Sequence, residues 1–135
     1  MAILAHVLQI VGLWIAPLII FVVKRESRFV SFHALQALLL QVLYLCLMGV
    51  GVFIWFGAVV LTMMAAQATG DAPSPPAFFV LMPMLWLDWM GLWVAMLVIA
   101  VVYGVRAGRG EWAEYPFLGP LARRMLKLGP GGVPV

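Results

Sequence analysis

Long apolar runs separated by short polar breaks dominate the chain. The runs cover about residues 2–23, 29–67 and 77–105, and the breaks hold charged residues or Gly, Ser and Pro. A run of about 20 apolar residues forms a helix long enough to cross the hydrocarbon core of a bilayer. The pattern therefore predicts an all-α integral membrane protein with three transmembrane helices, the second and third of them long.

The second run is longer than a bilayer requires. One helix over residues 29–67 would measure roughly 55–60 Å at 1.5 Å per residue, against a hydrocarbon core of about 30 Å. Either the helix breaks near Gly49–Gly51 into two short spans, or it extends past the bilayer on the outer side. The third run extends in the same way, so we expect an apolar hairpin over residues 57–83 to contact another subunit or the outer leaflet.

Composition supports the membrane interpretation. Of the 135 residues, 66% are hydrophobic and 10% are charged, whereas soluble domains are about half apolar and a quarter charged. A core of this size cannot hide that much apolar surface. The lone Cys46 cannot form an internal disulfide or, by itself, a metal site.

The basic residues form two clusters at opposite ends of the sequence. With three spans both clusters lie on one side of the membrane, whereas four spans would place them on opposite sides. The positive-inside rule therefore favours three spans, with the N-terminus outside and the C-terminus in the cytoplasm. These residues are expected to contact lipid headgroups rather than nucleic acid; they are Lys24, Arg25, Arg28, Arg106, Arg109, Arg123, Arg124 and Lys127.

Asp88 is the acidic residue within a predicted span, and such carboxylates are costly unless they are paired. If the first run is a single span, His6 lies at the same depth as Asp88, so the two side chains are candidates for a polar pair. A proton or ion path through Asp88 is an alternative. Such a path needs further polar groups, and the sequence shows none between Met90 and Val102.

His33 follows the basic turn and therefore lies, in a three-span arrangement, on the opposite side of the bilayer from His6. The two histidines then cannot share a metal or haem. Axial binding of haem or chlorophyll by His33 alone is the remaining cofactor possibility, and otherwise only bound lipid is expected. No catalytic motif or metal-ligand spacing is present, so the sequence predicts neither an enzyme nor a metal site.

Two motifs carry a family resemblance. They are FVSFHALQALLLQ (residues 29–41) and VRAGRGEWAEYPF (residues 105–117). Together they resemble the DUF4870/Tic20-like family of small membrane proteins, whose plastid relatives take part in protein import. The resemblance implies a membrane domain over residues 1–117, followed by an interfacial amphipathic segment and Gly/Pro tail over residues 118–135. The matching residues at the inner interface are Phe32, His33, Gln36, Gly110, Glu111, Tyr115, Pro116 and Phe117.

The function expected from these observations is that of a small, non-catalytic subunit. It would be an accessory or assembly component of a larger complex in the bacterial inner membrane. Its partners would be lipids and other membrane subunits, contacted through the hairpin at 57–83 and the helix faces. The resemblance implies an alternative, a protein translocation or insertion component, and the ion or proton path through Asp88 is the third possibility.

Overall fold

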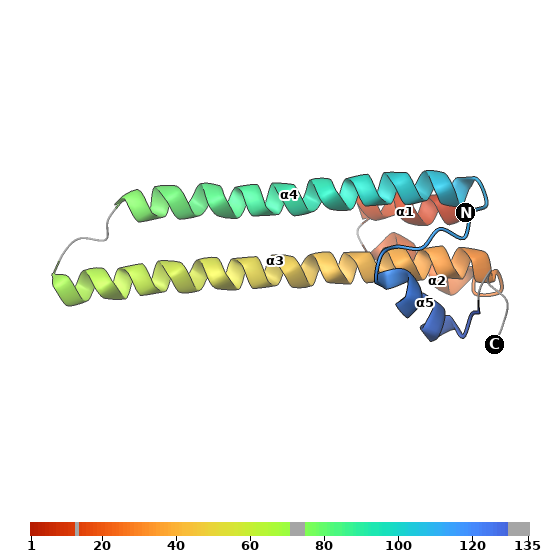
Figure 1. Ribbon diagram of the computed structural model, residues 1–135, viewed down its shortest axis with the longest axis horizontal. Helices are drawn as coiled ribbons and strands as arrows, with labels where there is room; N and C mark the ends of the chain where they lie inside the picture. Colours follow the sequence, from red (N-terminus) through yellow and green to blue (C-terminus); the bar gives the residue numbers. More distant parts are fainter. Residues whose placement is uncertain (13, 71–74, 130–135) are drawn as a thin grey trace. The chain divides into compact units, whose positions relative to one another are not determined.

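The computed structural model describes residues 1–12, 14–70 and 75–129, and these form five helices. The all-α prediction is confirmed. Two of the helices, the third and fourth, are long and apolar enough to cross a membrane, with mean hydropathies of 2.4 and 2.1 in their most apolar windows. The helices are α1 (Ala2–Gly12), α2 (Ile15–Val23), α3 (Arg28–Thr69), α4 (Pro75–Gly108) and α5 (Leu118–Leu126) (Figure 1).

The chain divides into two compact units, which are described separately below. Unit 1 comprises Met1–Leu43 and Ala95–Val135, and unit 2 comprises Tyr44–Val94. Both long helices contribute to both units. Unit 1 also contains all three short helices and the connection between α4 and α5.

The second apolar run forms a single helix. α3 has 42 residues and no break near Gly49–Gly51, so its length is roughly 63 Å at 1.5 Å per residue. α4 has 34 residues and contains Pro83. Of the two interpretations of the second run, the continuous helix that is longer than a bilayer is the one that the structure shows.

The first apolar run differs from the predicted single span. It forms two short helices, α1 and α2, that pack against each other (Figure 1). Pro17 does not kink a long helix but lies in the first turn of α2. Proline is tolerated in a first turn, where no helical hydrogen bond is lost, whereas it disrupts a helix that runs through it. A helix boundary shortly before Pro17 follows from this preference.

The N-terminus lies at the same end of unit 1 as the basic turn. Ile3 contacts Gly108 at the end of α4, where an added Cβ atom would lie 3.2 Å from the Ile3 Cδ1 atom. α2 ends at Val23, beside the turn that leads into Arg28 at the start of α3. The α1–α2 pair is therefore a helical hairpin whose two ends lie together. The third span, and the placement of the N-terminus across the bilayer from the basic turn, are not confirmed.

Unit 1 buries small and polar side chains and turns large apolar ones outward. On α1 the side chains of Ala5, His6 and Gln9 are fully buried, whereas Val7 and Leu8 are exposed. Small and polar residues at helix contacts are typical of membrane proteins, because lipid solvates large apolar side chains as well as a protein core does. The interior of unit 1 is accordingly suited to hydrogen bonding.

α5 packs against the first turns of α3. Phe32 and Leu35 from α3 form a small core with Ala122 from α5 and with Leu128. The helix lies within the predicted amphipathic segment and carries Arg123 and Arg124 in its last turn. Residues 130–135 of the predicted tail lie outside the described residues, as do residues 71–74 of the predicted break between the long helices, and the predicted domain boundary at 117 stays a prediction.

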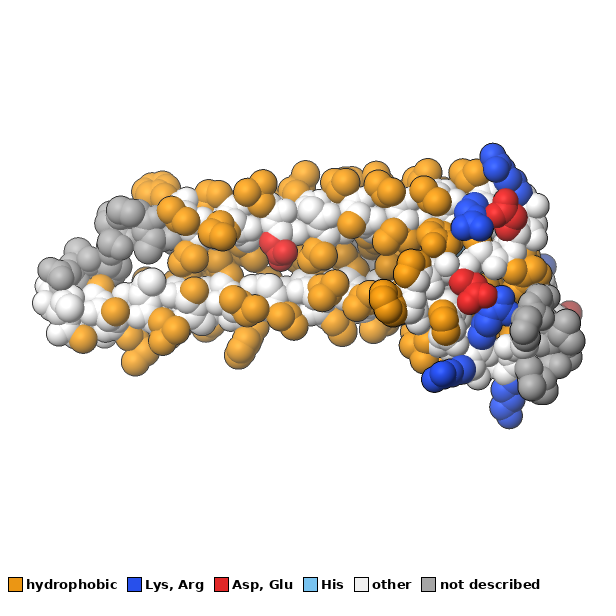
Figure 2. Space-filling view, in the orientation of Figure 1, with side chains coloured by type: hydrophobic (Ala, Val, Ile, Leu, Met, Phe, Trp, Pro, Cys, Tyr) orange, Lys and Arg blue, Asp and Glu red, His pale blue; other side chains and the backbone are white. Residues whose placement is uncertain are grey.

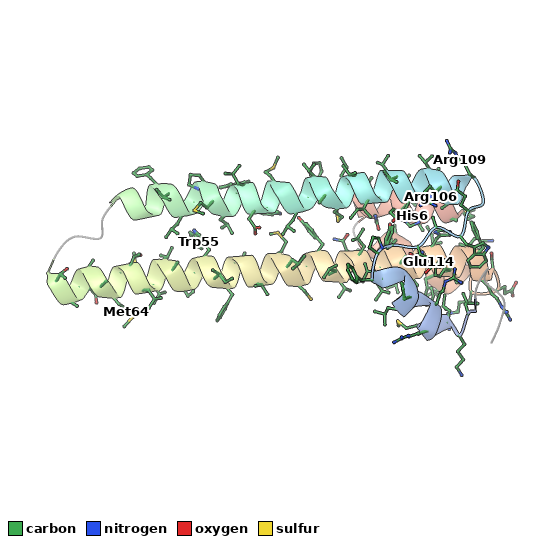
Figure 3. All side chains as sticks on the ribbon, viewed as in Figure 1. His6, Trp55, Met64, Arg106, Arg109 and Glu114 are labelled. Carbon is green, nitrogen blue, oxygen red and sulfur yellow. The ribbon has the colours of Figure 1, made fainter. Side chains whose placement is uncertain are left out.

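Unit 2 consists of the remaining parts of α3 and α4, whose large apolar side chains are widely exposed. Phe53 is 78% exposed and Leu87 is 72% exposed. Met64 points away from α4, whereas Trp55 points toward it (Figure 3). Apolar side chains also cover the face of the helices shown in Figure 2. So much exposed apolar surface requires a bilayer or a protein partner around it.

Candidate functional site: a buried polar network

Three side chains in unit 1 form a hydrogen-bonded chain. The Tyr115 hydroxyl lies 2.6 Å from Nδ1 of His6, and Nε2 of His6 lies 3.1 Å from Nδ1 of His33. Nε2 of His33 lies 3.1 Å from the backbone carbonyl oxygen of Glu111. The side chains of His6 and His33 are fully buried and Tyr115 is 2% exposed. The chain therefore links α1, α3 and the segment after α4 through the interior of unit 1.

With both imidazoles neutral, one arrangement of protons satisfies every bond. The carbonyl of Glu111 can only accept, so Nε2 of His33 donates to it. Nδ1 of His33 then accepts from Nε2 of His6, and Nδ1 of His6 accepts from the Tyr115 hydroxyl. A neutral imidazole has one donor and one acceptor nitrogen, so both rings are fully used. The network is a closed, directional set of bonds.

Gln36 attaches the segment after α4 to α3. Its Nε2 atom donates to the carbonyl of Ala113 at 3.2 Å, and its Oε1 atom accepts from the backbone N–H of Tyr115 at 2.6 Å. Ala113 and Tyr115 lie outside helices and strands, so their backbone groups have no partner from regular structure. The buried amide of Gln36 satisfies one backbone group of each. Gln36 and His33, one turn apart on α3, therefore hold the segment against α3.

Burial also changes the acidity of the tyrosine. Desolvation raises the pKa of the Tyr115 hydroxyl far above its usual value of about 10, with the neighbouring Tyr103 adding to the rise and Gln9 opposing it. The two tyrosine rings meet edge to face, with centroids 4.6 Å apart. Tyr115 therefore remains a hydrogen-bond donor at physiological pH.

Ion pairs surround this network at the basic end of unit 1. Arg106 donates to Glu111 at 2.7 Å, and Nε of Arg123 donates to Glu114 at 2.6 Å. The Arg123 guanidinium also lies 5.3 Å from the centre of the Phe32 ring. The Arg106 pair is about half exposed, so its contribution to stability is small. The Arg123 pair is more buried and joins α5 to the segment after α4.

All eight Lys and Arg residues belong to unit 1. Figure 2 shows those on its displayed face gathered around this end, and Figure 3 shows Arg109 projecting outward beyond Arg106. Arg106 and Arg123 are engaged in ion pairs. Lys24, Arg25 and Arg28 are exposed in the turn before α3. This arrangement agrees with the predicted role of the basic residues at a lipid headgroup layer, which remains a prediction.

The structure brings together most of the residues of the two sequence motifs. Phe32, His33 and Gln36 from the first motif contact Glu111 and Tyr115 or their neighbours from the second. Tyr115 is a buried centre of the network, rather than a residue exposed at the inner interface. The remaining residues of the second motif are peripheral: Gly110 forms a turn with a φ of 80°, Pro116 is exposed, and Phe117 is 92% exposed.

Two predictions about His6 are wrong. His6 was expected to pair with Asp88, but its ring nitrogens bond to His33 and Tyr115 instead. His6 and His33 were expected on opposite sides of the bilayer, yet they are direct partners, because α1 does not continue into a full span. Asp88 belongs to unit 2, where it lies against Gly51 of α3.

The cofactor prediction concerns His33. Both of its nitrogens are engaged, so axial ligation would require the loss of one hydrogen bond. Within the described part of the chain, no three His, Cys, Asp or Glu side chains come together as metal ligands do. Binding of a haem or pigment by His33 stays a prediction.

Sequence reasoning missed the inward face of α1. Ala2, Ala5, His6 and Gln9 recur at spacings of three and four residues, and all four are buried. A small and polar stripe of this kind on an otherwise apolar helix indicates contact with another polar segment. That stripe was the signal that could have linked α1 to the motifs at α3 and α4.

The fold and the network define a class: a small, all-helical membrane protein in which short helices and a connecting segment are locked onto two long apolar helices. A family model matches nearly all of it. The chain belongs to the magnetosome magnetite crystal formation protein family, whose model matches residues 1–122. This match overturns the assignment to the DUF4870/Tic20-like family. No curated protein and no solved structure matches the chain.

Proposed function

We propose that this protein is a non-catalytic subunit of the magnetosome membrane that supports magnetite crystal formation by organising other membrane proteins. The family match over residues 1–122 supports the process and the compartment. A magnetosome membrane continuous with the bacterial inner membrane also agrees with the basic, lipid-facing end of unit 1. The role of translocation component is dropped with the family that implied it.

The observation that carries an organising role is the apolar surface of unit 2. α3 and α4 are roughly 63 and 51 Å long, whereas a hydrocarbon core is about 30 Å thick. Phe53 and Leu87 are examples of the many exposed apolar side chains on these helices. Lipid alone can therefore cover only part of this apolar surface. Extended apolar faces of this kind are a feature of surfaces that bind other proteins.

The polar network supports the same role. Its donors and acceptors are bonded to one another and hold α1, α3 and the segment after α4 in a fixed arrangement. Catalysis by general acids and bases needs a group that can reach a substrate. In this structure the functional atoms of His6, His33 and Tyr115 are instead directed at one another or at the backbone carbonyl of Glu111.

Deletion of the chromosomal copy tests the proposal. Magnetite crystals are measured by electron microscopy in the deletion strain, and in the same strain carrying the wild-type chain on a plasmid. Purified magnetosomes are probed for the tagged protein, with cytoplasmic-membrane vesicles as the comparison. We expect the protein in the magnetosome fraction and a crystal size distribution that changes on deletion and recovers on complementation. Unchanged crystals, with the protein absent from magnetosomes, would contradict the proposal.

A further inference from the structure

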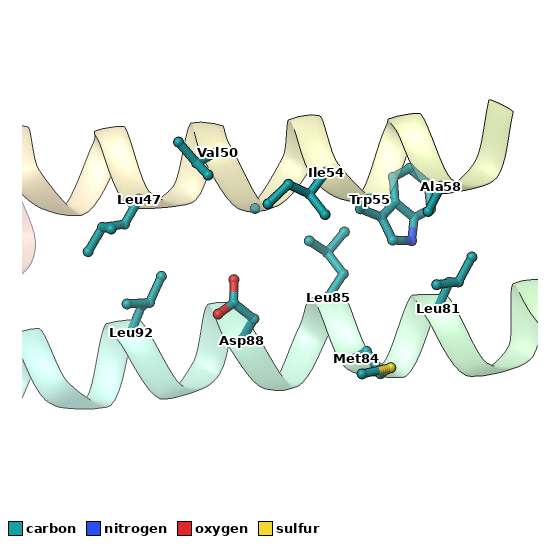
Figure 4. Close-up of a pocket in the computed structure, with 11 residues that line it drawn as sticks. Leu47, Val50, Ile54, Trp55, Ala58, Leu81, Met84, Leu85, Asp88 and Leu92 are labelled. Atoms are coloured by element: carbon teal, nitrogen blue, oxygen red, sulfur yellow. The ribbon is translucent and has the colours of Figure 1, made fainter. Parts of the chain in front are cut away.

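Unit 2 contains an apolar groove between α3 and α4. It has a volume of about 440 Å³ and extends from Leu47 and Leu92 at one end to Ala58 and Leu81 at the other. Figure 4 shows side chains of both helices facing this space. The lining is otherwise hydrocarbon and aromatic, and Asp88 is its one charged residue.

Asp88 has no compensating charge within its unit. It has no hydrogen-bond or ion-pair partner among the residues that the structure describes. The sequence holds no Lys or Arg between Phe29 and Val105, so unit 2 cannot supply a counter-charge. On α4, Asp88 precedes Arg106 by 18 residues, which is a rise of about 27 Å along the helix. If the hydrocarbon core of about 30 Å begins at Arg106, Asp88 lies near its opposite edge. A carboxylate beside this apolar lining is stabilised by an opposite charge.

Two further features of the groove concern the polar atoms beside its apolar lining. Gly51 on α3 makes room for Asp88, because a Cβ atom at Gly51 would lie 2.8 Å from the Asp88 Oδ2 atom. Farther along, the Nε1 atom of Trp55 is buried and has no hydrogen-bond partner among the described residues. The groove therefore offers an anion within an apolar lining, and Figure 4 shows the side chains of Asp88 and Trp55 reaching into it.

We propose that this groove binds a membrane helix of another protein, and that this helix places a Lys or Arg side chain against Asp88. An apolar helix face fills the groove, and its basic side chain neutralises the carboxylate of Asp88. Opposite charges within membranes pair in this way. The inference deepens the proposed function, on which it rests, by naming the chemistry of the partner.

The geometry disfavours other occupants. Most of the groove lies beyond Asp88 on the side away from Leu47 and Leu92, where Trp55, Ala58 and Leu81 line it. A lipid whose headgroup amine met Asp88 would direct its acyl chains toward the bilayer centre and leave that part empty. A second copy of this chain would bring another carboxylate to the site rather than a cation, and like charges repel.

Photo-crosslinking in the native membrane tests the proposal. A photoreactive amino acid replaces Leu85, which lines the groove, in the tagged full-length chain. The same replacement at Leu87, on the same helix and outside the groove, is the control. Three further substitutions are combined with the Leu85 probe: Asp88→Asn removes the charge, Gly51→Ala displaces the carboxylate, and Gly57→Ala adds a methyl group where nothing lies within 4 Å. Equal abundance in the membrane fraction shows that the variants fold.

The expected result is an adduct from position 85, and not from position 87, with one membrane protein whose crosslinked span contains Lys or Arg. Asp88→Asn and Gly51→Ala should lower its yield about tenfold, as loss of roughly 1.4 kcal/mol would, and Gly57→Ala should leave it unchanged. Exchange of the charges, with Asp88→Lys in this chain and Asp at the partner's basic position, should restore it. Adducts with a second copy or with lipid only, a partner span without a basic residue, or a yield that ignores Asp88→Asn would overturn the proposal.

The two proposals fail separately. If Asp88→Asn abolishes the adduct while deletion of the chain leaves the crystals unchanged, the groove binds its basic partner and the role in crystal formation is wrong. If deletion changes the crystals and the adduct does not depend on Asp88, the role stands and the basic partner is wrong.

Discussion

The bond between Tyr115 and His6 can be removed without changing the shape of either ring. Tyr115→Phe deletes the hydroxyl that donates to Nδ1 of His6 at 2.6 Å. Both residues are buried, so water cannot easily replace the donor. A buried acceptor left without a partner costs about 1–3 kcal/mol, and we expect a loss of that size in the free energy of unfolding.

Tyr103→Phe is the matched control. Tyr103 packs edge to face on Tyr115 and is only partly buried, and its hydroxyl takes no part in the bonds that join Tyr115, His6, His33 and Glu111. Its loss should cost less than about 0.5 kcal/mol. Both variants and the wild type are unfolded reversibly in detergent micelles with increasing sodium dodecyl sulfate, followed by circular dichroism. Equal stabilities for the two variants would refute the directional chain of bonds through His6.

Three further predictions concern the same unit. Gly119→Ala should weaken the packing of α5 by about 1–3 kcal/mol, because the added Cβ atom would lie 2.5 Å from Glu114 Cβ; Gly91→Ala, with nothing within 4 Å, should not. Proteolysis of the C-terminal region measures this, and equal cleavage rates would contradict it. The raised pKa of Tyr115 favours its protonated form in the folded state. The free energy of unfolding should therefore fall as the pH rises above about 10, the pKa of tyrosine in the unfolded chain, and it should fall less in Tyr115→Phe. Parallel pH profiles for the variant and the wild type would count against this. Finally, tags at the two ends of the chain should be digested by protease from the same side of the membrane, since α1 and α2 form a hairpin, and protection of one tag alone would restore a third span.

The long helices could be predicted because their signal is strong and local. After Arg28 the run of α3 contains no Pro and no Asp, Glu, Lys or Arg. This favours a long helix, although the sequence alone leaves a break near Gly49–Gly51 open, and the membrane location follows from the same runs. The hairpin of α1 and α2 could not be predicted with equal ease. Twenty apolar residues are long enough to span, and Pro17 can either kink a helix or begin one. Only packing against the rest of unit 1 selects the second option.

That one choice determined most of the errors at the site. A straight first span places His6 beside Asp88 and far from His33, whereas a hairpin places it beside His33. The motif residues His33 and Gln36 were identified, but their partners are mostly backbone groups of a segment without regular structure. Sequence patterns say little about such a segment, because its course depends on long-range contacts. The buried position of Tyr115 follows from those contacts rather than from its neighbours in sequence.

We propose that the chain supports magnetite crystal formation by binding a membrane partner through unit 2. The most direct measurement is the crystal size distribution in cells whose chromosomal copy carries Asp88→Asn, beside cells carrying Gly57→Ala, with equal amounts of protein in their magnetosomes. We expect altered crystals, approaching those of the deletion strain, for Asp88→Asn and normal crystals for Gly57→Ala. Normal crystals in both strains, when deletion of the whole chain alters them, would contradict it.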